Sequence, residues 1–244
     1  MSDREPGSGR VQRVRHDVIR REVEVVRVEN LAPHLRSIVF AGETLANFVS
    51  DSFDDHVKVM FDADTWRDYT PRRFDRQARE LTIEFVLHGD GPAANWAAQA
   101  RPGQGLTIGG PRGSFIVPMD YQWHLLVGDE TALPAIARRV EELPASTRAI
   151  VIAQAADVAD QRRFESAAAL GVQWVLQTSE LVSAVRGLAL PDGEGYVWCA
   201  GESGSMAEIR AILVGEKHHD RHGIRAAAYW KKGVLAHHEN LEDR

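Results

Sequence analysis

The sequence predicts two domains, an antiparallel β-sheet or barrel followed by an α/β domain with a parallel sheet. From about residue 20 to 120, short β-branched or alternating stretches are separated by turn residues. After about residue 121, continuous apolar stretches alternate with amphipathic helical patterns, as in parallel strands covered on both faces by helices. The predicted divisions of the 244 residues are a disordered tail over 1–17, a β domain over 18–120, an α/β domain over 121–235 and a C-terminal tail over 236–244.

The strands expected in the N-terminal domain follow one another at the spacing of a sheet or barrel. They are predicted near 23–28, 35–40, 57–61, 81–87 and 105–110, with one helix over 93–100. The pattern is clearest where Leu81, Ile83 and Phe85 alternate with Thr82 and Glu84, because alternate side chains of a strand share a face. The first 17 residues are polar and carry four arginines, so we expect them to be disordered.

The C-terminal domain is predicted to alternate strands with helices. Strands are expected near 125–127, 149–153, 172–176, 196–200 and 226–230, with helices near 133–140, 158–170, 179–187 and 206–213. Ligands of open α/β sheets bind beyond the carboxyl ends of strands, so the strand-to-helix turns over 128–134 and 199–206 are candidate sites. Ser205 and Glu208 have the spacing of a capping box. The alternative is that both turns are ordinary helix caps.

Composition excludes several classes of protein. The single cysteine, Cys199, excludes an intramolecular disulfide and a four-cysteine metal site. No apolar stretch reaches the roughly 18 residues of a membrane span, and the first 15 residues lack a secretory signal, so a cytoplasmic protein is expected. The net charge of −6 argues against a nucleic-acid partner. The histidines of 218–222 have metal-like spacing but lie in a polar linker, and we expect no metal site there.

Two segments of the N-terminal domain could bind a phosphate-bearing ligand. The sequence over 89–94, GDGPAA, follows a strand and opens a helix, which suits an anion. It lacks the acidic residue expected about 20 positions later in a Rossmann turn. His88 beside it could bind a ligand or simply end the strand. In the segment over 67–75, Arg67 offers a cation for phosphate and Tyr69 a ring for stacking. The alternative for this segment is a charged edge strand.

Short motifs in a fixed order carry a resemblance to a known family. Arg67-Asp-Tyr-Thr70 resembles the RxY(S/T) flavin motif of the ferredoxin-reductase superfamily. HGDGPAANW over 88–96, GPRGS over 110–114, GDETALP over 128–134, CAGES over 199–203 and YWKKG over 229–233 follow it. Over about residues 18–235 the sequence therefore resembles the siderophore-interacting proteins, a family of ferric-siderophore reductases. The resemblance implies a flavin-binding β-barrel followed by an α/β NAD(P)H-binding-like domain.

The resemblance also implies FAD as the cofactor and assigns residues to it. Arg67 would neutralise the diphosphate, Tyr69 would lie against the isoalloxazine ring, and Thr70 would hydrogen-bond near its reactive edge. The other implied cofactor-binding residues are Pro71, His88, Gly91, Pro92, Ala93, Ala94, Trp96, Asp129, Thr131 and Ala132. Two acids at 129–130 replace the glycine-rich turn usual in the superfamily, and they should repel a pyrophosphate. The choice among NADH, NADPH and ferredoxin as electron donor therefore stays open.

A ferric siderophore is an anionic substrate, so an acidic protein needs a local basic pocket to bind it. The candidates are Lys58, Arg112, Lys231 and Lys232, and the alternative for each is a solvated surface charge. Tyr229 or Trp230 could cover a flavin face or belong to the core. Electron transfer needs no acid or base, so no catalytic residue is predicted. The favoured function is an FAD-dependent ferric-siderophore reductase that uses NAD(P)H or a ferredoxin. The alternatives are a general flavin reductase or diaphorase, and a flavin-bearing module that binds iron complexes without turnover.

Overall fold

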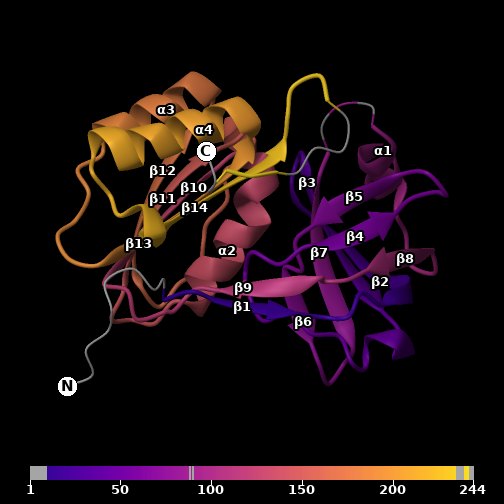
Figure 1. The fold of residues 1–244 in the computed structure, drawn as a ribbon. Coiled ribbons are helices and arrows are strands. Elements are labelled where there is room, and N and C mark those ends of the chain that lie inside the picture. Colours follow the sequence, from indigo (N-terminus) through magenta and orange to yellow (C-terminus); the bar gives the residue numbers. More distant parts are fainter. Residues whose placement is uncertain (1–9, 88, 90, 235–238, 242–244) are drawn as a thin grey trace, which may run out of the picture.

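A computed structural model describes residues 10–87, 89, 91–234 and 239–241, and it confirms the predicted two-domain fold (Figure 1). The N-terminal domain is built on an antiparallel sheet, and the C-terminal domain on a sheet whose first five strands are parallel. The two domains lie side by side, and helix α2 (Leu133–Glu142) lies at their junction.

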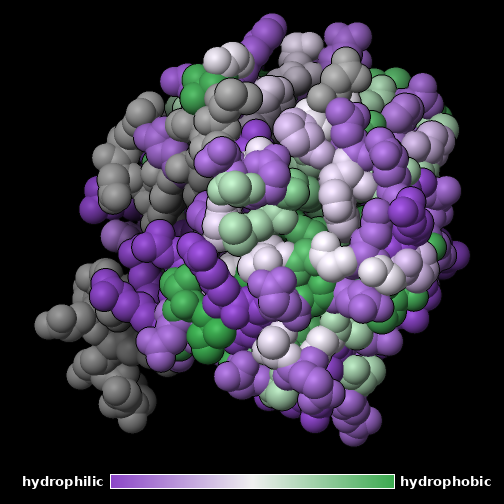
Figure 2. All heavy atoms as spheres, turned by 90° about the vertical axis from the view of Figure 1, so that its right-hand side faces the viewer, coloured by the Kyte–Doolittle hydropathy of each residue, from purple (hydrophilic) through white to green (hydrophobic). Residues whose placement is uncertain are grey.

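The N-terminal sheet has seven strands in the order β5-β4-β8-β2-β3-β7-β6, so β5 and β6 are its edges. The apolar side chains of its strands, such as Val25, Phe40 and Ile83, are fully buried in one core. Figure 2 views this domain from its outer side, where hydrophilic side chains cover most of the surface and hydrophobic ones gather in a central band. The elements are β2 (Arg20–Ala32), β3 (Leu35–Ala41), β4 (Val57–Met60), β5 (Trp66–Tyr69), β6 (Arg73–Asp75), β7 (Glu80–Val86), α1 (Pro92–Gln99) and β8 (Gly105–Gly109).

The C-terminal sheet has six strands in the order β12-β11-β10-β13-β14-β15, of which β15 alone is antiparallel to its neighbour. Helix α2 packs in a core on one face of the sheet, and α3 and α4 pack in a second core on the other face. Continuous burial of β10 and β13 follows from this double cover. The elements are β10 (Trp123–Gly128), β11 (Arg148–Gln154), β12 (Ala169–Val175), α3 (Thr178–Gly187), β13 (Gly195–Glu202), α4 (Ser203–Ala211), β14 (Ile224–Trp230) and β15 (Glu239–Asn240).

Three expectations about the chain are wrong. Part of the expected disordered tail forms β1 (Gln12–Arg15), which pairs with β9 (Gly113–Ile116) in a two-stranded sheet. The expected helix over 158–170 is instead a 3₁₀ turn at Val158–Asp160, an irregular stretch and the start of β12. Part of the expected C-terminal tail forms β15 against β14. Among the described residues, none of the helices combines the length and hydropathy that a bilayer crossing requires.

Polar side chains join the two domains. Asp54 of the N-terminal domain forms an ion pair with Arg225 of β14, and both side chains are largely buried. Glu84 of β7 lies 2.6 Å from Nη1 of Arg162, which follows β11. These buried pairs fix the position of β14 and the β11–β12 connection against the N-terminal sheet. They thereby define the space that remains between the domains.

Candidate functional site

A cavity of about 360 Å³ lies between the two domains. Its N-terminal side consists of β4, β5, the end of β7 and the start of α1, and its C-terminal side of the turn after β10 and the end of β14. This places it at the carboxyl end of the parallel sheet, where α/β folds bind ligands. The lining residues are His56, Lys58, Trp66, Arg67, Asp68, Tyr69, Thr70, Glu84, Val86, Gly91, Ala93, Ala94, Thr131, Pro134, Tyr229, Trp230 and Val234.

The edge strand β5 and the residue that follows it bring three of the predicted flavin residues, Arg67, Tyr69 and Thr70, to this cavity. The ring centroid of Tyr69 lies 4.4 Å from that of Phe85, so the core holds the tyrosine from behind. Burial raises the pKa of Tyr69 above its ordinary value, and the hydroxyl therefore stays protonated. Thr70 is 6% exposed. Arg67 donates from Nη1 to the carbonyl of Trp66 at 2.8 Å, which leaves most of its guanidinium donors for a ligand.

The start of α1 gives the cavity a second group of donors. Gly91 is the N-cap and Pro92 opens the helix, and neither supplies a side chain that caps the first turn. The first backbone N–H groups of a helix have no partner within the helix, so they can bind an anion. Ala93 and Ala94 line the cavity at this point. Trp96, on the next turn, stacks on Phe40 with centroids 6.2 Å apart and supports the helix from the core.

Asp129 lies beside the cavity, and its carboxylate is buried in the protein and does not line the cavity. It is 4% exposed, and burial raises its pKa although several groups donate hydrogen bonds to it. Its oxygens accept from the Thr131 backbone at 3.0 Å, the Thr131 hydroxyl at 2.5 Å, the Glu202 backbone at 2.9 Å and the Trp230 indole at 2.8 Å. The carboxylate of Asp129 is therefore turned away from an incoming pyrophosphate. Asp129 and Ala132 are not among the lining residues, whereas Thr131 is.

The end of β14 supplies two aromatic rings whose role the sequence left open. Tyr229 donates to Asp54 Oδ1 at 3.3 Å, and its hydroxyl pKa is raised by burial and then by that carboxylate. Trp230 is 40% exposed and lines the cavity with it. Lys231 and Lys232 lie in the turn between Trp230 and Val234 but do not line the cavity.

The candidate substrate cations are only partly brought together. Lys58 lines the cavity, and its Nζ lies 2.9 and 3.2 Å from the two carboxylate oxygens of Asp68. Arg112 is exposed outside the cavity lining, and its carbonyl accepts a hydrogen bond from the His16 backbone at 3.0 Å. Of the other cofactor candidates, Pro71 and Pro92 also lie outside the lining, and His88 lies outside the described residues.

Sequence reasoning missed several lining residues. Glu84 appears in the sequence as an outward residue of an alternating strand, yet it is 5% exposed. It is buried because Arg72 and Arg162 lie 3.2 and 2.6 Å from its oxygens, and this pairing across domains has no local signal. Trp66 and Asp68 could have been found, because they flank Arg67 on the same strand. The other missed residues are His56, Val86, Pro134 and Val234.

The turn after β13 differs from its prediction. Helix α4 begins at Ser203, and Glu202 is its N-cap, accepting from the Ser205 backbone at 2.9 Å. The expected cap by Ser205 is therefore wrong, because the helix begins two residues earlier and Ser205 lies inside its first turn. Burial alone would raise the pKa of Glu202, but backbone donors from Ser205, Gly204 and Lys232 lower it on balance.

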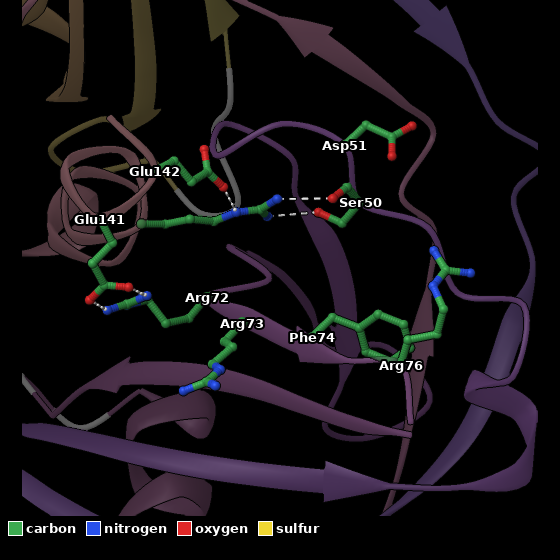
Figure 3. Close-up of a pocket in the computed structure, with 9 residues that line it drawn as sticks. Ser50, Asp51, Arg72, Arg73, Phe74, Arg76, Glu141 and Glu142 are labelled. Carbon is green, nitrogen blue, oxygen red and sulfur yellow. Dashed lines mark hydrogen bonds and ion pairs between the residues drawn. The ribbon is translucent and has the colours of Figure 1, made fainter. Parts of the chain in front are cut away.

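Two further cavities lie away from this site. One of about 370 Å³ contains the ion pairs Arg72–Glu141 and Arg138–Glu142, and Arg138 also donates to Ser50 (Figure 3). The Arg72–Glu141 pair and the bond from Arg138 to Ser50 thus join α2 to the N-terminal domain. The other, of about 700 Å³, includes His218, His219 and His222 at the amino ends of the parallel strands. Across the described residues no three potential metal ligands converge, in this cavity or elsewhere.

The cavity between the domains has the parts that a flavin dinucleotide needs. Aromatic rings line it, and a guanidinium and a helix start that no described side chain caps provide donors for a diphosphate. The fold and site therefore define a two-domain flavoprotein. Residues 24–66 and 62–115 match the siderophore-interacting FAD-binding domain, and residues 121–233 match the siderophore-interacting protein family. The chain belongs to this family, as the resemblance predicts.

Relatives cover almost the whole chain. The NADPH-dependent ferric-chelate reductase of Escherichia coli K12 is 34% identical over 245 residues, which are 90% of this chain and 96% of that protein. Ferric vibriobactin reductase ViuB of Vibrio cholerae is 30% identical, with 90% and 93% covered. The crystal structure of a siderophore utilization protein from T. fusca superposes with a TM-score of 0.88 at 31% identity, covering 93% of this chain and 98% of that one.

Proposed function

We propose that this protein is an FAD-dependent ferric-siderophore reductase, which reduces siderophore-bound Fe(III) to Fe(II) and so releases the iron. The observation that carries the proposal is the interdomain cavity, in which Arg67, Tyr69 and the start of α1 lie together. The names of the relatives from Escherichia coli and Vibrio cholerae, a ferric-chelate reductase and a ferric vibriobactin reductase, support it.

The proposed FAD site assigns each part of the cavity to a part of the cofactor. Arg67 and the N–H groups of Ala93 and Ala94 bind the diphosphate, because charge-assisted bonds and helix N-termini both favour phosphate. Tyr69 lies against the isoalloxazine ring, and Thr70 hydrogen-bonds near its edge. Tyr229 and Trp230, from the other domain, limit the space around the ring and exclude water. Bound flavin supplies the match between a two-electron donor and a one-electron acceptor such as ferric iron.

The electron donor that we propose is NADPH, after the name of the relative from Escherichia coli. The inward orientation of Asp129 favours this proposal, because the carboxylate that was expected to repel a pyrophosphate is buried and hydrogen-bonded. A ferredoxin is the second candidate donor. Since both donors belong to the cytoplasm, the proposal places the reaction there. The partner is a ferric siderophore, and no nucleic-acid or membrane partner is proposed.

The test is the visible spectrum of the purified protein and its response to reductants without oxygen. We expect a yellow protein that NADPH, NADH or a reduced ferredoxin bleaches, and whose colour returns when a ferric siderophore is added. A protein that is colourless and does not bind added FAD would contradict the proposal. Bleaching followed by reoxidation with free flavin but with no ferric complex would favour the flavin reductase. Bound flavin that none of the three donors reduces would favour the binding module.

A further inference from the structure

The charge balance of the cavity depends on one pair of residues on neighbouring strands. Lys58 of β4 lies directly opposite Asp68 of β5 in the antiparallel register, and both line the cavity. Side chains that are opposite each other in this way have Cβ atoms about 5 Å apart. The backbone therefore keeps the carboxylate near the ammonium group, whether or not the ion pair of 2.9 Å itself is always formed.

The other arginine and carboxylate side chains of the described lining are already assigned. Glu84 is paired with Arg72 and Arg162. Arg67 is the cation that the proposed function uses for the FAD diphosphate. Lys58 is then the cation left in the lining for a substrate, and Asp68 neutralises it. The turn with Lys231 and Lys232 adds positive charge next to the cavity rather than in its lining.

We propose that Asp68 is a specificity-determining residue: it masks the charge of Lys58, so that the cavity favours ferric chelates of low net negative charge over strongly anionic ones. This inference rests on the proposed function and narrows its substrate class. A ferric ion bound by three singly charged hydroxamates is neutral, whereas one bound by three doubly charged catecholates carries three negative charges. The two lysines of the neighbouring turn still attract the anionic complex, so its binding is weakened rather than abolished.

The test measures binding of gallium complexes, which have the charge and shape of the ferric ones but accept no electron. The FAD-loaded protein is titrated with a tris-hydroxamate and a tris-catecholate gallium complex, and tryptophan fluorescence reports binding. In the Asp68→Asn variant we expect the tris-catecholate to bind about five- to tenfold tighter at 0.1 M salt, and the tris-hydroxamate to change by less than about twofold. The gain should shrink as the salt concentration rises.

Two controls separate this effect from a change in net charge. Adding Lys58→Gln to Asp68→Asn should remove the gain, because the unmasked cation is then absent. Asp192→Asn changes the net charge equally, but Asp192 lies before β13, at the amino ends of the parallel strands and away from the cavity at their carboxyl ends, so it should give no gain. An unchanged affinity of Asp68→Asn for the tris-catecholate, or an equal gain in Asp192→Asn, would overturn the proposal.

The failure of this inference can be told apart from failure of the proposed function. If FAD is bound but no ferric chelate is reduced with any donor, the reductase assignment fails, while the gallium titrations still decide the role of Asp68. If the wild-type protein reduces ferric chelates and Asp68→Asn shows no altered preference, the specificity inference alone is wrong.

Discussion

The indole of Trp230 donates a hydrogen bond of 2.8 Å to Asp129, and this bond connects the ends of β14 and β10 across β13. It holds a ring that is 40% exposed at the cavity between the domains. The same carboxylate also accepts from two backbone N–H groups and one hydroxyl. Asp129 thus connects the turns after β10 and β13 with the end of β14 on the C-terminal side of the site.

The first prediction concerns the hydrogen bonds of Asp129. Asp129→Ala should lower the free energy of unfolding by about 2–4 kcal/mol, because it leaves buried backbone donors without an acceptor. Trp230→Phe removes one of the bonds and should cost about 1 kcal/mol. Urea unfolding followed by circular dichroism measures both. Equal stability of Asp129→Ala and the wild type would show that these donors find other partners.

The second prediction concerns Arg67 and the diphosphate. Arg67→Ala should raise the dissociation constant of FAD by about 10- to 100-fold, since a charge-assisted hydrogen bond contributes about 1.5–3 kcal/mol. Titration of the apoprotein with FAD measures this value. Arg163 is an exposed arginine in the connection between β11 and β12, and Arg163→Ala is the matched control that should bind FAD as the wild type does. FAD binding unaffected by Arg67→Ala would place the diphosphate elsewhere.

The third prediction concerns pH. His124 is fully buried and its ring nitrogens have no hydrogen-bond partner among the described residues, and burial followed by repulsion from Arg139 lowers its pKa to about 3. The unfolded chain takes up a proton near pH 6.5 and the folded chain only near pH 3, so acidification between these values favours unfolding. Its contribution to the slope should approach about 1.4 kcal/mol per pH unit.

The measurement for His124 is the free energy of unfolding from pH 7 to pH 4. His124→Gln should flatten this dependence relative to the wild type, whereas His218→Gln, which alters an exposed histidine, should leave it unchanged. Parallel curves for the wild type and His124→Gln would disprove the assignment.

The fourth prediction concerns the contact between domains. Asp54→Ala leaves the largely buried Arg225 without its carboxylate and should lower the free energy of unfolding by about 3–5 kcal/mol. Tyr229→Phe removes the 3.3 Å hydrogen bond to the same carboxylate but leaves the ion pair, and it should cost less than about 1.5 kcal/mol. Thermal and urea unfolding measure the difference. If the two variants were equally stable, the ion pair would not be what joins the domains.

The order of strands and helices could largely be predicted because most of them bury one face. Leu81, Ile83 and Phe85 alternate as predicted and are fully buried. β1 could not be predicted, because all four of its residues are exposed and no apolar pattern marks an exposed two-stranded sheet. The expected helix over 158–170 was wrong for a related reason: the run of alanines favours a helix locally, but Ala169 begins the edge strand that pairs with β11.

The candidate site was predictable where its residues lie in one segment. Arg67 and Tyr69 belong to β5 and Thr70 follows it directly, while Ala93 and Ala94 lie at the start of α1, so the two motifs predicted a shared ligand. The pairing of Lys58 with Asp68 depends on the register between β4 and β5. The length of the turn between these strands did not allow that register to be predicted. The inward orientation of Asp129 depends on Glu202 and Trp230, more than 70 positions away.

The segment before β2 has a practical consequence. Arg10 forms ion pairs with Asp120, at the domain boundary, and with Glu194, which precedes β13 in the C-terminal domain. The following strand β1 pairs with β9, which belongs to the N-terminal domain. Residues 10–15 therefore bridge the two halves of the protein instead of trailing from one of them. Anyone trimming the protein for crystallisation, or attaching a purification tag, should leave this bridge intact and cut before residue 10, because removing it would free the halves to shift around the shared cavity.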